Sequence, residues 1–314
     1  MGLNLNRSAE ILSAPPLQDQ ILARVDSLSH LPTTPTVALK FIELGNDPEV
    51  DHGDYAAVIS ADASLSAELL KLANSPWFGI RNKVTSIKNA VKLLGLPAIR
   101  TLAISHCLTG VYSELRIDRT ESKAFWQVAL CKAVAAKQFA SQWDDGPSEE
   151  AFLAGMLQDL AIPVMYAVAK EQQIAILLDP ANDWRTQLRR ERAAFQMDHT
   201  EVGHLLAERL RLPAPFADAI SFHHNYDGLG DLVARDGLRD AVYAASLFPH
   251  ALVHWNRKDA DEFGGFLHEH TQSTPVEIGT FLAGVQTEFD QLFGYFEDGQ
   301  PPEARLPELF TATD

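Results

Sequence analysis

The sequence predicts an all-α protein, because apolar residues recur at helical spacing almost everywhere and strand-like alternation is hard to find. The segment that contains Ile59, Leu65, Leu69 and Leu72 shows this helical spacing clearly. Hydrophobic residues make up 46% of the 314 residues and charged residues 22%, which are ordinary values for a globular protein. A chain of this length can bury a substantial core without crosslinks.

The expected helices are short and are delimited by residues that start or stop helices. Ser86 can cap a helix that begins at Ile87, Gly95 can end that helix, and Pro97 suits the first turn of the next one. The same reasoning predicts further helices over residues 17–29, 35–45, 54–60, 64–74, 98–112, 121–142, 149–172, 183–196, 199–210, 214–225, 237–257 and 276–295.

Charge and cysteine content exclude several classes of protein. Acidic residues outnumber basic ones by 42 to 26, so the net charge of −16 disfavours nucleic acid and anionic membranes as partners. Cys107 and Cys131 form no CxxC pair, so neither a disulfide scaffold nor a cysteine zinc site is expected. Residues 1–20 have no signal-peptide core, and the apolar run from Leu160 to Ala169 is interrupted by Pro163. We therefore expect a cytoplasmic protein without a membrane span.

Basic residues are concentrated in the first third of the chain. No acid occurs from Leu69 to Ser113, whereas residues 259–314 contain twelve acids and the single base Arg305. One interpretation is a face that receives an acidic partner, a phosphorylated ligand or the protein's own acidic tail; the other is an ordinary solvated face. The bases of this candidate face are Lys71, Arg81, Lys83, Lys88, Lys92 and Arg100.

A second basic cluster, which comprises Arg185, Arg189, Arg190 and Arg192, is interpreted as solvated surface. Arg185, Arg189 and Arg192 share one helix face, and Asp183 and Glu191 are near enough to neutralise part of their charge.

Several histidines and one aspartate are the candidate chemical residues, since imidazole is the commonest metal ligand. His199 and His204 are five residues apart, about 140° around a helix, so they cannot jointly bind one ion as an i, i+4 pair does. His223 and His224 differ by about 100° on a helix, so at most one of them is expected to point inward. No phosphate-binding glycine loop and no GxSxG motif occurs.

Short motifs in a particular order suggest a family. The first group comprises Leu31-Pro32, Pro35, Asp47-Pro48, Ile59, Asp62, Leu65, Leu69-Leu70 and Leu72-Ala73-Asn74-Ser75. The second comprises Ser86-Ile87, Ala90, Leu93-Leu94-Gly95-Leu96, Phe125-Trp126, the run Ala151 to Asp159, His199-Thr200-Glu201-Val202-Gly203, and His223-His224. Over residues 20–225 this order resembles the HDOD domain, the HD-related output domain.

The resemblance implies an HD-domain-like helical bundle with an N-terminal helical lobe, used by bacteria for signal transduction and related to metal-dependent phosphohydrolases. By this resemblance, catalytic relatives have a histidine near Val128 and a His-Asp pair at 158 and 159, and those that cleave cyclic dinucleotides continue the pair with Gly-Lys where this chain has Ala161-Ile162. Gln158 replaces the central histidine here, so only Asp159 of that pair remains.

The remnant of the HD-type site is therefore Gln158, Asp159, His199, His223 and His224. A hydrolytic metal site needs several converging ligands and an open position for water, and this set is depleted. We expect no catalytic residue, no cofactor and no metal; if an ion binds, its ligands are Asp159, His199, His223 and His224.

The expected domain organisation has four parts. Residues 1–16 are an N-terminal extension, and 17–225 form the HDOD-like domain, with an N-terminal lobe at 17–115 and an HD-like bundle at 120–225. Residues 226–296 add helices that complete the bundle, and 297–314 form an acidic tail.

Three functions follow as hypotheses. The first is a non-catalytic regulatory module, a pseudoenzyme that binds regulatory protein partners. The second is a metal-dependent phosphohydrolase that has rebuilt its site with residues such as His106 or His204. The third is a sensor of a nucleotide second messenger, such as a cyclic dinucleotide, that uses the basic 71–100 region.

Overall fold

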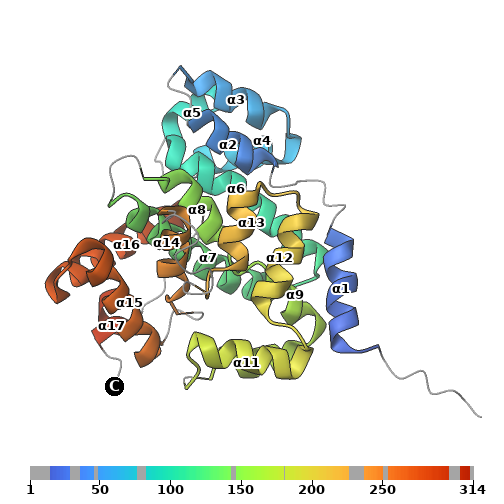
Figure 1. The fold of residues 1–314 in the computed structure, drawn as a ribbon. Helices are drawn as coiled ribbons and strands as arrows, with labels where there is room; N and C mark the ends of the chain where they lie inside the picture. Colours follow the sequence, from blue (N-terminus) through green and yellow to red (C-terminus); the bar gives the residue numbers. More distant parts are fainter. Residues whose placement is uncertain are drawn as a thin grey trace, which may run out of the picture.

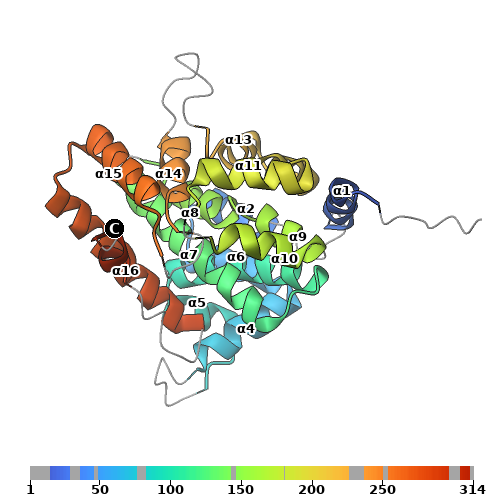
Figure 2. The same cartoon turned by 90° about the horizontal axis from the view of Figure 1, so that it is seen from below.

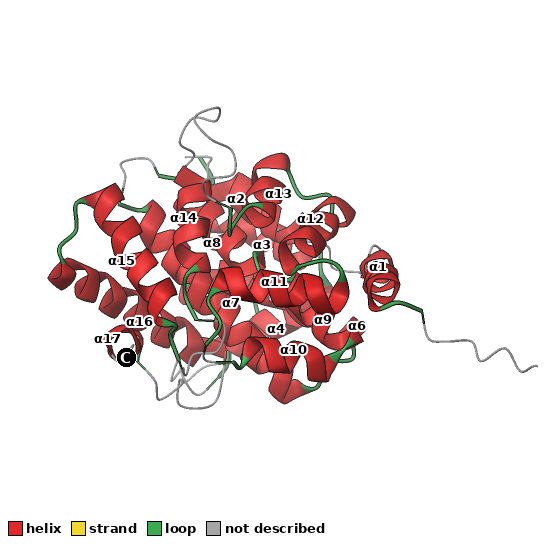
Figure 3. Ribbon diagram, turned by 60° about the horizontal axis from the view of Figure 1, so that its bottom comes forward, coloured by secondary structure: helices red, strands yellow, loops and turns green. Residues whose placement is uncertain are grey.

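The computed structural model describes residues 15–28, 36–45, 49–75, 83–142, 146–179, 181–225, 237–249, 254–296 and 305–311. Every regular element in these ranges is a helix (Figure 3), which confirms the all-α prediction. Some residues of the sequence motifs lie outside the described ranges, namely Leu31, Pro32, Pro35, Asp47, Pro48 and Arg81.

A small hydrophobic core lies at the N-terminal end of the fold. Its helices are α2 (Thr36–Gly45), α3 (His52–Ser60), α4 (Ala63–Ala73), α5 (Ile87–Leu94) and the first half of α6 (Leu96–Glu114). Asp62 caps the start of α4, because its side chain accepts hydrogen bonds from the backbone N–H groups of Ser64 and Leu65. The apolar residues that follow lie on one face of the helix, so Leu65 and Leu69 are buried in the small core. In Figure 1 these helices form the upper part of the molecule.

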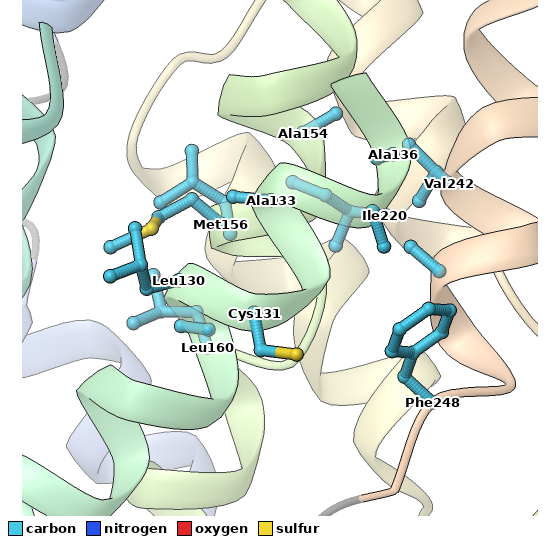
Figure 4. Close-up of a cluster of buried hydrophobic side chains, with 14 of the residues drawn as sticks. Leu130, Cys131, Ala133, Ala136, Ala154, Met156, Leu160, Ile220, Val242 and Phe248 are labelled. Atoms are coloured by element: carbon cyan, nitrogen blue, oxygen red, sulfur yellow. The ribbon is translucent and has the colours of Figure 1, made fainter. Parts of the chain in front are cut away.

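A larger core occupies the rest of the chain. Its centre is the close pair α7 (Arg119–Ala140) and α8 (Ser148–Leu157), with α14 (Gly237–Ser246) and α16 (Pro275–Phe296) packed against α7. Figure 4 shows part of this core, which includes Leu130 and Cys131 of α7 together with Met156 and Phe248. Cys131 and Cys107 are both buried, and burial raises the pKa of each thiol to about 12. Both cysteines are therefore unreactive packing residues.

Helix α1 (Leu17–Ser27) belongs to the larger core. Its Ile21 and Val25 pack there, next to α9 (Ala161–Val168) and α12 (His199–Arg209). This packing differs from the expected lobe of residues 17–115, which grouped α1 with the small core. Figures 1 and 2 both show α1 on the side of the molecule opposite α15 (Arg257–Thr271) and α16.

Two of the expected helices are interrupted. The expected helix 149–172 is divided into α8, α9 and the start of α10 (Lys170–Leu177). The break between α8 and α9 arises because the ring of Pro163 would clash with the carbonyl of Asp159 in a continuous helix, and the second break lies at Ala169, whose backbone is not helical. The expected helix 237–257 ends at Ser246, shortly before Pro249, and α15 follows as a separate helix capped by Asn256. The other helices are α11 (Trp184–Phe195), α13 (Ala214–Ser221) and α17 (Leu306–Thr311).

One segment of the described chain has the length and composition of a membrane span. It covers Ser148–Val168, with a mean hydropathy of 1.5, and 83% of its most apolar window is buried inside the protein. Ile87–Leu94 and Leu96–Glu114 would pass the same test only if joined, and they are bent by 113°. Burial of this kind is typical of central core helices.

The contact between α7 and α8 depends on Gly155. A Cβ atom at this position would lie 2.9 Å from Cβ of Ala136 and 3.0 Å from the carbonyl oxygen of Lys132. Gly155→Ala should therefore lower the free energy of unfolding by about 1–3 kcal/mol, measured by urea denaturation. The control is Gly265→Ala in α15, where a Cβ meets nothing within 4 Å and should stabilise the helix by about 0.5–1 kcal/mol. Equal effects at the two positions would contradict this account.

Candidate functional site

The structure brings together four of the predicted site residues from three separate segments. Asp159 lies in the turn after α8, His199 begins α12, and His223 and His224 follow α13. Their potential ligand atoms all lie within 4.8 Å of one another. Nε2 of His223 is 3.4 Å from Oδ1 of Asp159, and Nε2 of His199 is 3.8 Å from the same oxygen.

Local structure explains why His199 points into this cluster. Asp198 and Glu201 form a reciprocal capping box, which fixes the start of α12 at His199. Behind the ring, the carboxylate of Glu191 accepts hydrogen bonds from the backbone N–H of His199, at 2.9 Å, and from Nδ1, at 2.6 Å. Because a carboxylate only accepts, Nδ1 carries the proton and Nε2 faces Asp159.

Glu191 was not predicted as a site residue. It is fully buried, and its other oxygen accepts hydrogen bonds from the side-chain amides of Gln173 and Gln187. Three arginines of the second basic cluster pair with other acids, namely Arg185 with Glu262, Arg190 with Asp179 and Arg192 with Asp198. The available sequence signal was that Gln187, Glu191 and Phe195 lie at i, i+4 and i+8, which defines a buried helix face.

The prediction that only one of His223 and His224 points inward was wrong. Both side chains are buried, with exposed fractions of 1% and 2%. The prediction assumed a continuing helix, whereas α13 ends at Ser221 and both histidines lie in the turn after it. Nδ1 of His223 donates to the carbonyl of Ile220 at 2.6 Å, and the ring of His224 stacks on Trp184 with centroids 5.1 Å apart.

Lys132 is the residue that most changes the interpretation of the site. It projects from α7, is completely buried, and places its ammonium nitrogen 2.5 Å from Oδ2 of Asp159. A lysine is almost never fully buried unless it is paired. Lys132 lies one helical turn after Val128, and Val128 is the position near which the resemblance implies a histidine. The signal in the sequence was a single charge inside the apolar run from Ala129 to Ala136.

Burial and nearby charges give the three histidines different pKa values. Burial would lower the pKa of His199, but the carboxylates of Glu191, Asp159 and Asp198 outweigh it and hold the pKa above its ordinary value. Burial lowers the pKa of His223, and the carboxylate of Asp159 offsets this only in part. Burial, together with the neighbouring His223 and His199, holds the pKa of His224 well below its ordinary value. His223 and His224 are therefore neutral at physiological pH.

The opening beside Asp159 is narrow and apolar. Its volume is about 30 Å³, and its lining includes Val128, Met156 and Ile162 together with the side chain of Asp159. A cavity needs about 10–15 Å³ of such volume for each water molecule, so this space holds about two. Val128 and Ile162 thus stand where catalytic relatives, by the resemblance, have a histidine and a lysine.

The donor set itself suits a transition metal, because one carboxylate and three imidazoles match the preferences of Zn²⁺, Fe²⁺ and Mn²⁺. The ammonium of Lys132 competes with such an ion for Asp159. Gln158 is fully buried, and within the described residues neither atom of its side-chain amide has a hydrogen-bond partner.

The other sequence candidates lie outside this cluster. His204 is half-exposed and contacts Ser221, while His106 pairs with Glu68 on α4. Lys71, Lys83, Lys88 and Lys92 are exposed, as expected of a basic face. Arg100 is not part of that face, because it is buried against the ring of Phe152 and pairs with Glu149. Burial lowers the pKa of Arg100 to about 10.

An all-helical bundle with this histidine and aspartate cluster has the architecture of HD-related proteins. The family model described as the HDOD domain matches residues 31–226, and this chain belongs to that family. Among solved structures, an HDOD domain protein of unknown function from Geobacter sulfurreducens has a TM-score of 0.59 at 21% identity, covering 88% of this chain and 99% of its own.

Other relatives carry provisional names. A protein from Marinobacter aquaeolei VT8, provisionally named a signal transduction protein, has a TM-score of 0.57 at 22% identity and covers 88% of this chain and 63% of its own. A protein from Shewanella amazonensis SB2B, provisionally named a phosphohydrolase, has a TM-score of 0.56 at 19% identity. The match covers 95% of this chain and 99% of that protein's chain. These likenesses show the fold.

A sequence relative is longer than this chain. An uncharacterized protein from Treponema pallidum (strain Nichols) is 29% identical over 210 residues, which amount to 64% of this chain and 39% of that protein. This chain thus spans less than half the length of that relative.

Removal of one partner of the Lys132–Asp159 pair should be more damaging than removal of both. Lys132→Met leaves a largely buried carboxylate without its ammonium, so the free energy of unfolding should fall by about 3 kcal/mol. Lys132→Met combined with Asp159→Asn should recover at least half of that loss. A double-mutant cycle by urea denaturation measures the coupling. Additive losses would show that the two side chains do not interact.

Asp259 should make stability depend on pH near neutrality. Burial raises the pKa of Asp259 to about 7. The hydrogen bond from the N–H of Trp184 lowers this pKa, whereas the nearby carboxylates of Asp183 and Glu262 raise it further. The folded state therefore retains a proton that the unfolded chain has lost, and this contribution to stability disappears as pH rises from about 4 to about 7.

The test is Asp259→Asn, which should remove that loss, so the variant gains stability relative to the wild type as pH rises from about 4 to about 7. The exposed neighbour Asp261, paired with Arg257, supplies the control Asp261→Asn, which should keep the wild-type slope. Parallel pH profiles for the wild type and Asp259→Asn would refute the assignment.

Proposed function

We propose that this chain is a non-catalytic signal-transduction module of the HDOD family, in which the ammonium of Lys132 takes the place of a metal ion. The main observation in support of this proposal is the 2.5 Å contact between this buried ammonium and Asp159, the one residue that remains of the family's His-Asp pair. The module transmits its signal by binding a regulatory protein.

Charge balance supports this proposal. Asp159 and Glu191 bring two carboxylates into the cluster, and Lys132 supplies a fixed positive charge against them. The cluster thus has an internal cation, and an incoming metal would have to displace it or share Asp159 with it at a high cost in repulsion. The narrow apolar opening also gives a phosphodiester no room beside Asp159.

The proposed partner is acidic and binds the lysines of the small core. Lys71, Lys83 and Lys92 are exposed there, whereas Lys88 lies close to Asp51, whose pKa it helps to lower. The acids of α3 therefore offset part of this charge, and a partner would contact a mixed surface with a basic excess.

A second candidate function is metal-dependent phosphohydrolysis. It is favoured by the convergence of four potential ligand atoms within 4.8 Å, and in it Asp159, His199, His223 and His224 would hold the ion. A bound metal would supply an activated water for attack on phosphorus. In this function the side chain of Lys132 would have to leave Asp159.

Metal binding distinguishes the two functions. Protein purified without chelator should contain much less than one equivalent of manganese, iron or zinc, and should not hydrolyse bis(p-nitrophenyl) phosphate when these ions are added. Lys132→Ala should acquire saturable binding of Mn²⁺ or Zn²⁺ by calorimetry, because the competing ammonium is gone. Lys137→Ala is the matched control, since Lys137 is on the same helix and pairs with Glu288 near the surface.

The opposite result is equally clear. Stoichiometric metal in the wild type, with turnover that disappears in Asp159→Ala and His199→Ala, would establish the hydrolase and overturn the non-catalytic proposal.

A further inference from the structure

A second pocket, separate from the histidine cluster, opens where α4, α6 and α7 meet. We call it the interlobe pocket and define it by Glu68, Ser105, His106, Arg119, Lys123 and Trp126. Its volume is about 260 Å³, several times that of the opening beside Asp159. This space approaches the range of small-molecule sites, which begins at about 300 Å³.

The pocket lies on the boundary between the two hydrophobic cores. Leu102 in its wall belongs to the small core, while Tyr112 and Trp126 belong to the large one. Helix α6 runs through both cores, and α4 and α7 approach it from either side of the boundary. A molecule in this pocket would therefore touch elements of both parts of the fold.

Two hydrogen bonds fix the polar groups of the pocket. The indole N–H of Trp126 donates to Oγ of Ser105 at 2.7 Å, and Nδ1 of His106 lies 2.9 Å from a carboxylate oxygen of Glu68. The hydrogen bond with Glu68, opposed by burial, raises the pKa of His106. The carboxylate of Glu68 therefore has the imidazole of His106 as its hydrogen-bond partner inside the pocket.

Two further cations face the same space. Arg119 and Lys123 are at i and i+4 in the first turns of α7, so they share one helix face. Arg119 is exposed and makes no ion pair within the described residues. Lys123 places its ammonium 5.3 Å from the centre of the Phe293 ring. Arg119 therefore brings to the pocket a positive charge that no acid among the described residues pairs with.

The acids nearest to Arg119 along the chain make other contacts. Asp118 caps the start of α7 by accepting the N–H of Glu121 at 3.0 Å. Glu121 itself pairs with Lys170. The guanidinium of Arg119 is thus available for a carboxylate or phosphate group, which it can bind through two parallel hydrogen bonds.

We infer that the interlobe pocket binds a small organic anion, whose phosphate or carboxylate group contacts Arg119 and whose planar apolar body packs against Trp126 and Leu102. This site is independent of the proposed non-catalytic role of the histidine cluster. Tyr112 lines both this pocket and the opening beside Asp159.

Calorimetry on the full chain with three probes tests this inference. Phenyl phosphate and phenylacetate present the two anionic groups on an aromatic body, and inorganic phosphate presents an anion alone. At least one aromatic probe should bind with saturable heat at one site per chain, and more tightly than inorganic phosphate. The stronger of the two identifies the anionic group that the pocket prefers.

Variants locate the binding. Arg119→Gln should weaken binding of the aromatic probe by about tenfold or more, because it removes a charge-assisted hydrogen bond. Lys71→Gln is the matched control, since it removes an exposed positive charge one turn from Glu68 on α4 but outside the pocket, and its affinity should stay within about twofold of the wild type. Arg119 is exposed, so its replacement does not endanger the fold.

Three results would overturn the inference. They are the absence of saturable binding of both aromatic probes at millimolar concentrations, equal affinity for inorganic phosphate, and equal weakening by Arg119→Gln and Lys71→Gln. The last result would show a general attraction of anions to the basic part of the chain. None of these results bears on metal binding by Lys132→Ala, so the proposed function and the pocket fail or succeed separately.

Discussion

The contact between the buried ammonium of Lys132 and the carboxylate of Asp159 is the constraint on which the rest of the site depends. Two carboxylates, three imidazoles and a lysine share one largely dry interior, and a buried charge is tolerated only when it is paired. Without the ammonium, the negative charges of Asp159 and Glu191 would face each other across His199. The pair therefore allows the family's polar cluster to persist in a closed core.

The scaffold makes this pair geometrically available. Gly155 lets α8 approach α7 so closely that a side chain there would meet the backbone at Lys132, and Asp159 follows just after the end of α8. The lysine side chain needs to span only the short distance between the two helices. Close packing and the ion pair are thus consequences of the same contact, which joins the fold to the chemistry of the site.

The sequence predicted the fold class, most helices and four members of the cluster, because these follow from periodicity and from motifs in order. It could not predict the paired burial of His223 and His224, since that depends on α13 ending at Ser221. Lys132 and Glu191 were missed for a common reason: charged residues are assigned by default to the surface, and only tertiary packing shows that two buried charges face the same cluster.

Helix α6 gives the two cores a shared element, and this has a physical consequence for any signal that the protein carries. Its first half packs with α4 and α5, and its second half packs in the large core and brings Tyr112 beside the opening to Asp159. Displacing α6 at one end therefore disturbs contacts at the other, because packed interiors leave few gaps that could absorb a shift. In the proposed non-catalytic function, the cluster closed by Lys132 and Asp159 suits such a role, since it holds α7, α8, α12 and the turn after α13 together.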